Sequence, residues 1–179
     1  IKIGAALSLT GRAAYYGEQT KNGLDLAIEK INKENYPFKL ELIYEDTQSD
    51  AAPAVSAINK LIDIDKVKVI VGLVRSSDVL AAAPIAEKNK VILFTTMAST
   101  DEITKAGDYI FRNRETSASH GKKMAELLIN KNIRNVAVIS SNSSNSIGYR
   151  TFFMDNFKEL GGQVVSLVEY DEKNNDFRT

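Results

Sequence analysis

Hydroxyl and amide side chains gather in short polar segments that follow runs of apolar residues, and these side chains are suited to bind a small anion. The segments are residues 8–16, 46–50, 74–77, 96–99 and 141–148. Ser76, Ser77 and Ser99 each stand at the start of a helix-like stretch. Hydroxyls and the unpaired N–H groups of a helix N-terminus together form a seat for a carboxylate. A single serine there is as often an ordinary helix cap, so the argument depends on several of them converging.

The patterns that mark common enzyme sites are missing from the sequence. There is no glycine-rich nucleotide loop, no nucleophile elbow and no cysteine, and His120 is the one histidine. A lone histidine beside a glycine at a helix start is expected to be structural, and it cannot form a metal site without further nitrogen or sulfur ligands. Asp46 and Asp50 could act as a catalytic or cation-binding pair, but a turn followed by a helix N-cap is the simpler interpretation. We therefore predict no catalytic residues, no metal and no cofactor.

Charge and hydropathy exclude two further classes. Lysine plus arginine and aspartate plus glutamate each number 23, so the net charge is zero. A nucleic-acid-binding protein needs a clustered positive surface, and none is indicated. The sequence contains no run of 18 apolar residues, which is about the length that a membrane-spanning helix needs. The chain opens directly on an apolar strand-like segment, so we expect either a cytosolic protein or one whose targeting segment has been removed.

Apolar runs alternate with amphipathic stretches of helical length. Strands are expected over residues 1–9, 39–45, 67–73, 91–95, 109–112, 135–140 and 163–170, and helices over 18–35, 50–64, 76–87, 99–105, 119–130 and 147–160. The polar residues 171–179 complete no element. This β-α order predicts an α/β fold of Rossmann-like parallel sheets with helices on both faces. The alternation over 39–45 is typical of a strand at a sheet edge.

Two domains are expected, with a boundary in the polar stretch 112–117. Residues 1–116 would form most of a first ligand-binding lobe, and residues 117–179 the start of a second. Two β-α units cannot cover a parallel sheet, so we expect exposed apolar faces and an incomplete second lobe in a truncated chain. In such sheets ligands bind at the carboxyl ends of the strands, where the polar segments lie. Tyr15 and Tyr16 would there supply an apolar wall with a polar tip.

The polar segments, taken in order, resemble those of the type I periplasmic solute-binding proteins, in the leucine/isoleucine/valine-binding branch. The matching pieces run along essentially the whole chain. They are Ile3-Gly4 to Leu9-Thr10-Gly11, Tyr16-Gly17, Ala27-Ile28, Ile31-Asn32, Glu45-Asp46-Thr47, Asp50-Ala51, Val71-Gly72, Ser76-Ser77, Ala98-Ser99-Thr100, Phe111-Arg112 and Val136–Ile139.

The resemblance implies a two-lobed protein, monomeric when complete, that closes on an amino acid or small organic acid and delivers it to a membrane ABC permease. It implies a periplasmic or extracytoplasmic location, with a lipid anchor as one form, and no nucleic-acid partner. By position, Tyr16 resembles the aromatic residue beside the ligand side chain, and Ser76 with Ser77 the hydroxyls that meet its carboxylate. Met97, Ala98 and Ser99 resemble contacts to carboxylate and ammonium.

The second-lobe contacts would come from Ile147, Gly148 and Tyr149. Here the chain departs from the family, which often has Tyr-Gly where this sequence has Ile147-Gly148. Tyr149 could replace the missing ring. The acidic partner of the ligand ammonium is expected beyond residue 179, so the resemblance leaves the ligand open.

Two alternatives remain open. The same fold serves as the ligand-sensing domain of a receptor or regulator, which sequence outside this chain would distinguish. A flavodoxin-like or Rossmann-type enzyme is the weakest alternative, because it needs a phosphate loop or a nucleophile that the sequence lacks.

Overall fold

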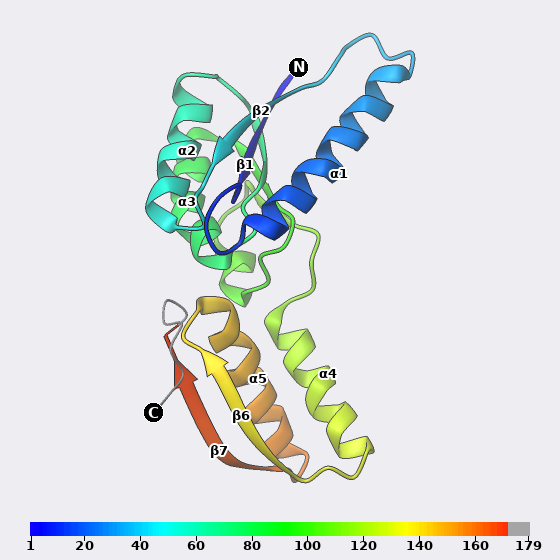
Figure 1. Ribbon diagram of the computed structural model, residues 1–179, viewed down its shortest axis with the longest axis vertical. Helices are drawn as coiled ribbons and strands as arrows, with labels where there is room; N and C mark the ends of the chain where they lie inside the picture. The colour runs from blue at the N-terminus through cyan, green and yellow to red at the C-terminus, as the bar shows by residue number, and fades with distance from the viewer. Residues whose placement is uncertain (172–179) are drawn as a thin grey trace. The chain divides into compact units, whose positions relative to one another are not determined.

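A computed structural model describes residues 1–171 of the chain, which divide into two compact units (Figure 1). The first unit comprises residues 1–98 and 102–114, and the second comprises residues 99–101 and the chain from Glu115 onward. The sequence analysis expected a boundary between two ligand-binding lobes at residues 116 and 117. That expectation concerns the lobes of the whole protein, so it stays a prediction. The residues after 171 lie outside the described part of the chain, as does nearly all of the expected polar tail.

The first unit is built on a five-stranded parallel sheet in the order β2-β1-β3-β4-β5. Its strands are β1 (Lys2–Leu7), β2 (Glu41–Asp46), β3 (Val69–Gly72), β4 (Ile92–Thr95) and β5 (Ile110–Arg112). Strand β2 lies at the edge and pairs with β1 from Lys2↔Glu41 to Leu7↔Asp46. The edge position predicted from the alternation of apolar and polar side chains in residues 39–45 is therefore confirmed.

Helices cover both faces of this sheet, as predicted. Helix α1 (Ala14–Lys33) lies on one side, and α2 (Ala51–Asp63) and α3 (Ser76–Asn89) lie together on the other (Figure 1). The core fills the space under α2 and α3, where Ile58, Leu61, Ile70, Val79 and Leu93 are all fully buried. Only Gly17 of α1 is buried, so α1 packs more loosely.

Several helix starts differ from the sequence-based expectations, and α4 (Ser117–Asn130) begins two residues before the expected residue 119. Helix α1 begins at Ala14 rather than residue 18, because its cap, Ala13, uses no side chain and leaves no signal in the sequence. Helix α5 (Ser144–Glu159) begins three residues early, because the Ser143 hydroxyl accepts from the Ser146 N–H. The short helix expected over 99–105 is a 3₁₀ helix, η1 (Asp101–Lys105).

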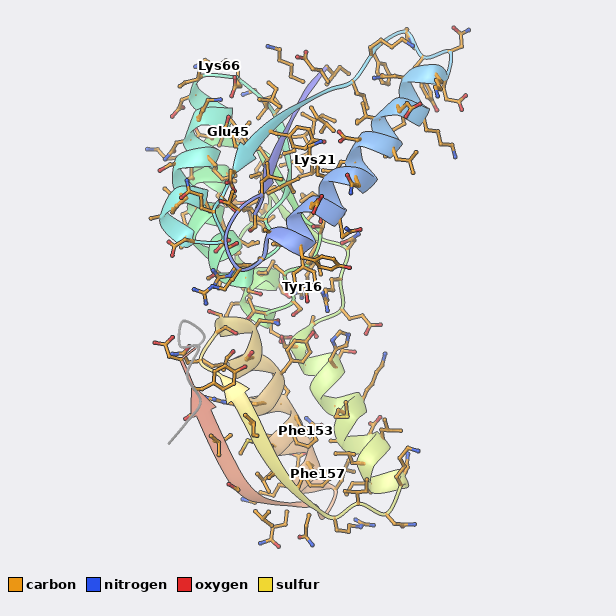
Figure 2. The ribbon with its side chains drawn as sticks, in the orientation of Figure 1. Tyr16, Lys21, Glu45, Lys66, Phe153 and Phe157 are labelled. Carbon is orange, nitrogen blue, oxygen red and sulfur yellow. The ribbon has the colours of Figure 1, made fainter. Side chains whose placement is uncertain are left out.

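The second unit holds two parallel strands and two helices. Strand β6 (Asn135–Ser141) pairs with β7 (Gln163–Tyr170), and α4 (Ser117–Asn130) packs against α5. Gly121 permits the close approach of the helices, since a Cβ there would lie 2.7 Å from the Phe153 backbone nitrogen. Phe157 is fully buried and stacks on Phe153, and Figure 2 shows both rings extending from α5.

Apolar side chains of the second unit remain exposed, as expected for so few β-α units. Ile139 is 74% exposed, Val165 59%, Val168 51% and Met124 50%. A groove of about 590 Å³ runs between α4, α5 and β6. Among residues 1–171, no helix combines the length and apolar character that crossing a membrane requires.

Candidate functional site

The loop after β1 is fastened to the end of β2 by the Asp46 carboxylate. Oδ1 of Asp46 accepts from the backbone N–H groups of Leu9 at 2.9 Å, Thr10 at 3.2 Å and Gln48 at 2.8 Å, and Oδ2 accepts from the Thr10 hydroxyl at 2.6 Å. Burial alone would raise the pKa of Asp46, but these hydrogen bonds from Thr10, Gln48 and Leu9 outweigh it and hold the pKa below its usual value. The carboxylate therefore has a structural role, and we call this set of hydrogen bonds the Asp46 clasp.

Asp50 is the N-cap of α2, and its side chain accepts from the Ala52 N–H at 3.1 Å. The interpretation of residues 46–50 as a turn followed by a cap is therefore confirmed. Within residues 1–171, no group of three or more histidine, cysteine, aspartate or glutamate side chains could hold a metal ion.

Two glycines allow the loop after β1 to pass close to its neighbours. Gly11 has a φ of +80°, and a Cβ there would lie 2.5 Å from the Gln48 carbonyl oxygen. A Cβ at Gly17 would lie 2.0 Å from the Ser8 carbonyl oxygen, so only glycine lets α1 begin so near β1. Helix α1 then carries Tyr16, 50% exposed and labelled in Figure 2, with its ring edge-on to Tyr15 at 5.6 Å. Both rings are open to solvent.

The loop after β3 turns sharply into α3. Gly72 has a φ of +119°, and a Cβ there would lie 2.2 Å from the Ala6 carbonyl oxygen. Ser76 is the first residue of α3 and is buried, while the Ser77 hydroxyl donates to Asp78 Oδ1 at 2.9 Å. Asp78 is fully buried in the first turn, where the positive end of the helix dipole favours a carboxylate. The guanidinium of Arg75 donates to the Ser49 carbonyl oxygen.

A buried hydroxyl joins the loops after β3 and β4. Thr95 Oγ1 donates to the Leu73 carbonyl oxygen at 2.7 Å and accepts from the Ala98 N–H at 3.3 Å. Ala98 is buried, and the Met97 carbonyl oxygen accepts from the Arg114 guanidinium at 3.3 Å. Tyr16, Ser76, Ser77, Met97 and Ala98 thus all belong to the carboxyl ends of β1, β3 and β4, which are neighbouring strands.

The remaining predicted site residues belong to the second unit. The Ser99 hydroxyl donates to Asn145 Oδ1, and its carbonyl oxygen accepts from the Ser117 N–H at 2.8 Å and hydroxyl at 3.1 Å. Ile147, Gly148 and Tyr149 lie in the first turns of α5 rather than in a loop. A Cβ at Gly148 would lie 3.1 Å from the Ser117 side chain. Ser99 is therefore held at the N-terminal ends of α4 and α5.

Tyr149 ends a chain of three polar side chains. Its hydroxyl lies 2.7 Å from His120 Nδ1, and His120 Nε2 lies 2.8 Å from Glu115 Oε2. The two rings stack with centroids 5.3 Å apart. The hydrogen bond from His120, followed by the charge of Lys123, holds the pKa of Glu115 below its usual value.

Sequence reasoning singled out the loops but missed four side chains that fasten or extend them. They are Asp46 as a clasp, Arg114, Glu115 and His120 as a partner of Tyr149. Their distant partners lie between 5 and 37 positions away in the sequence, and the spacing offers no signal of these contacts.

The whole chain is similar to known binding proteins. A family model described as "Periplasmic binding protein" matches residues 1–179. The leucine-, isoleucine-, valine-, threonine- and alanine-binding protein of Pseudomonas aeruginosa is 32% identical over 184 residues, covering 99% of this chain and 48% of that protein. The chain spans about half the length of the curated relatives it matches.

Solved structures of binding proteins also match this chain over nearly its whole length. A leucine-binding protein of Thermotoga maritima matches with a TM-score of 0.90 and 32% identity, over 99% of this chain and 51% of that one. A solute-binding protein of an ABC transporter from Rhodopseudomonas palustris BisB5, in complex with 3,4-dihydroxybenzoic acid, matches with a TM-score of 0.93 and 30% identity, over 99% and 49%.

Proposed function

We propose, from the premise that this chain belongs to the periplasmic binding protein family, that it binds an amino acid or a similar small carboxylate. The prediction that it is not an enzyme is confirmed at the level of the family, which is one of binding proteins. The whole protein would work outside the cytoplasm and deliver its ligand to an ABC permease. The names of the relatives support this proposal, since they describe amino-acid-binding proteins and a solute-binding protein of an ABC transporter.

The observation that carries the proposal is the fastened set of loops at the carboxyl ends of β1, β3 and β4. The loop after β3 ends at the N-terminus of the 14-residue helix α3, where the positive end of the helix dipole favours an anion. Ser76 stands at the start of that helix, and Thr95 holds the neighbouring loop beside it. A ligand carboxylate would take hydrogen bonds from these loops without their having to rearrange.

Charge near α3 constrains what can bind there. Asp78 places a buried carboxyl group in the first turn, and in its ionised form this group would oppose a second carboxylate close by. Arg75, the residue before α3, brings a positive charge to the same loop. A ligand carboxylate would therefore sit toward Arg75 and Ser76. Tyr15 and Tyr16 offer apolar ring surface for the rest of the ligand.

Isothermal titration calorimetry on the full-length protein tests the proposal. The panel is L-leucine, L-isoleucine, L-valine, 4-hydroxybenzoate and 3,4-dihydroxybenzoate. Ser76→Ala should weaken binding of the ligand that the wild type prefers by about 10- to 100-fold, which corresponds to roughly 1.5–3 kcal/mol for a hydrogen bond to a charged group.

Ser56→Ala is the matched control, because the Ser56 hydroxyl lies exposed on α2 and donates only to the Ala52 carbonyl oxygen. It should leave the affinity unchanged. If no member of the panel binds the wild type, the proposed function is wrong. Equal affinities for Ser76→Ala and wild type would remove Ser76 from the site.

A further inference from the structure

Helix α1 buries far fewer residues than the other two α-helices of the first unit. Gly17 is the only buried residue among its 20, whereas α2 buries five of 13 and α3 six of 14. The apolar stripe of α1, formed by Leu24, Ile28 and Ile31, is only half-buried. Because a helix in a protein is held mainly by the burial of its apolar face, most of α1 depends on other contacts to stay on the sheet.

Three polar side chains fasten the middle of α1 to the edge strand β2, and we call them the α1 latch. Tyr44 of β2 donates a hydrogen bond to Asp25 Oδ1 at 2.5 Å, and Lys21, labelled in Figure 2, pairs with Asp25 Oδ2 at 2.6 Å. The Lys21 ammonium also lies 4.7 Å from the centre of the Tyr44 ring. The side chains of Lys21 and Asp25 are 38% and 47% exposed, so water screens the latch and limits its strength.

Tyr44 and Asp25 keep the protonation states that their hydrogen bond requires. The hydrogen bonds from Lys21 and then from Tyr44 hold the pKa of Asp25 below its usual value. Burial, followed by the hydrogen bond to Asp25, raises the pKa of Tyr44 well above its usual value. At neutral pH Tyr44 is therefore the donor and Asp25 the acceptor, so the latch opens by breaking contacts rather than by titration.

The first turn of α1 is held more firmly than the rest of the helix. The Ala13 N–H donates to the Ser49 hydroxyl at 3.0 Å in a buried hydrogen bond, and that hydroxyl donates to the Thr10 carbonyl oxygen at 2.8 Å. Gly17 packs so closely on the end of β1 that a Cβ there would lie 2.0 Å from the Ser8 carbonyl oxygen. The start of α1 is therefore fixed to the sheet independently of the latch.

Two features beyond this fixed start determine how easily the rest of α1 detaches. Gly23 has no atom within 4 Å of the place a Cβ would take, so packing does not require glycine there, and glycine weakens a helix interior relative to alanine. At the end of α1, the Asn32 side chain accepts from the Leu40 N–H and donates to the Leu40 carbonyl oxygen, both at 2.8 Å. Detachment has to break this pair and the latch, but it uncovers no fully buried side chain of α1 after Gly17.

We propose that residues 18–33 of α1 detach from the sheet as one cooperative segment while the sheet, α2 and α3 stay folded. The hinge lies just after Gly17, and the α1 latch sets how often the segment opens. The hydrophobic core stays closed, because it lies under α2 and α3 on the other face of the sheet (Figure 1). The Asp46 clasp and the Ser49 hydroxyl keep the loop after β1 in place in both states.

Native-state hydrogen exchange on the full-length protein tests the proposal without any ligand. In wild type, the amides of residues 22–33 should exchange at least about tenfold faster than those of β1 and β3. Their exchange should rise only weakly with low concentrations of urea, because detachment exposes little surface, whereas exchange in β1 and β3 should rise steeply. Residues 22–33 that exchange as slowly as β1 and β3, with the same urea dependence, would overturn the proposal.

Substitutions in the latch test what holds the segment. Tyr44→Phe keeps the ring beside Lys21 but removes the hydrogen bond to Asp25, so exchange of residues 22–33 should become about three- to tenfold faster. Tyr36→Phe removes the same hydroxyl group from an exposed ring in the loop after α1 and is the matched control, with wild-type exchange. Gly23→Ala should slow exchange of residues 22–33 by about two- to fivefold. Wild-type exchange in Tyr44→Phe would refute the latch.

Leu61→Ala separates detachment of α1 from unfolding of the whole unit. Leu61 is fully buried under α2, so this variant should speed exchange in β1 and β3 by at least about 30-fold. Residues 22–33 should keep their wild-type rate, because their detachment leaves Leu61 buried. If Leu61→Ala speeds α1 and the strands by the same factor, α1 opens only when the whole unit unfolds and the proposal is wrong.

Discussion

The Asp46 clasp makes a quantitative prediction about stability and its dependence on pH. We consider Asp46→Asn, which keeps the size of the side chain but removes its charge and turns one acceptor into an NH₂ donor. Four donors now converge on the carboxylate: three backbone N–H groups and the Thr10 hydroxyl. An amide keeps the three backbone N–H bonds only as bonds to a neutral oxygen, and its NH₂ group can no longer accept from the Thr10 hydroxyl, which would have to rotate and accept instead.

The magnitude follows from how far each bond is shielded from water. Only the bond from the Leu9 N–H is partly buried, and the bonds from Thr10 and Gln48 are exposed. A shielded hydrogen bond to a charged group contributes about 1.5–3 kcal/mol, whereas exposed ones are screened and contribute a few tenths each. Asp46→Asn should therefore lower the free energy of unfolding by about 2 kcal/mol at neutral pH.

The pH dependence has a definite sign. The pKa of Asp46 is lower in the folded than in the unfolded protein, because the hydrogen bonds from Thr10, Gln48 and Leu9 outweigh the opposing effect of burial. Its contribution is complete above the unfolded pKa of about 3.9 and is lost as the pH falls through the folded value. The difference in stability between wild type and Asp46→Asn should therefore shrink at acid pH.

Urea unfolding, followed by circular dichroism and by amide hydrogen exchange in β1 and β3, measures both effects. Asp50→Asn is the matched control, since asparagine caps a helix as well as aspartate does, so its stability should match that of wild type. If Asp46→Asn has the stability of wild type at neutral pH, or keeps the same deficit at acid pH, the clasp does not act as described.

Four further substitutions test the packing. Gly17→Ala places a Cβ 2.0 Å from the Ser8 carbonyl oxygen and should cost about 3 kcal/mol in urea unfolding, whereas Gly23→Ala, with no atom within 4 Å, should stabilise by about 0.5–1 kcal/mol. Leu61→Ala leaves a cavity in the first unit and should cost about 2–5 kcal/mol, with loss of exchange protection in β1 and β3. Phe157→Ala should cost about 3–5 kcal/mol, with the loss confined to β6 and β7; equal losses in both units would contradict the two-unit description.

Most of the fold could be predicted because hydrophobic periodicity records which faces are buried. The seven strands and six helical segments expected from the sequence all occur among residues 1–171. The largest errors lie at helix starts, where the signal depends on the cap. Asp50 is a side-chain cap followed by Pro53, and the start of α2 was predicted within one residue. Ala13 makes no such bond, and the start of α1 was predicted four residues late.

The candidate site was predictable as a set of loops but not as a set of contacts. The carboxyl ends of neighbouring parallel strands must lie together, so Ser76, Met97 and Ala98 could be grouped from the sequence. Which side chains meet depends on tertiary packing. Nothing in the spacing of Thr10 and Asp46, or of His120 and Tyr149, indicates that they are in contact.

The hydroxyl of Thr95 has a kinetic consequence. It is fully buried and bonds to both the loop after β3 and the loop after β4. Because one atom joins them, the two loops should fluctuate as a single body on the nanosecond scale rather than independently. Under the proposed function, a ligand that encounters this part of the first unit would find its partners already correlated, so each encounter would have a higher chance of capture. Thr95→Val would decouple the loops and slow association, even where the contacts made after capture remain the same.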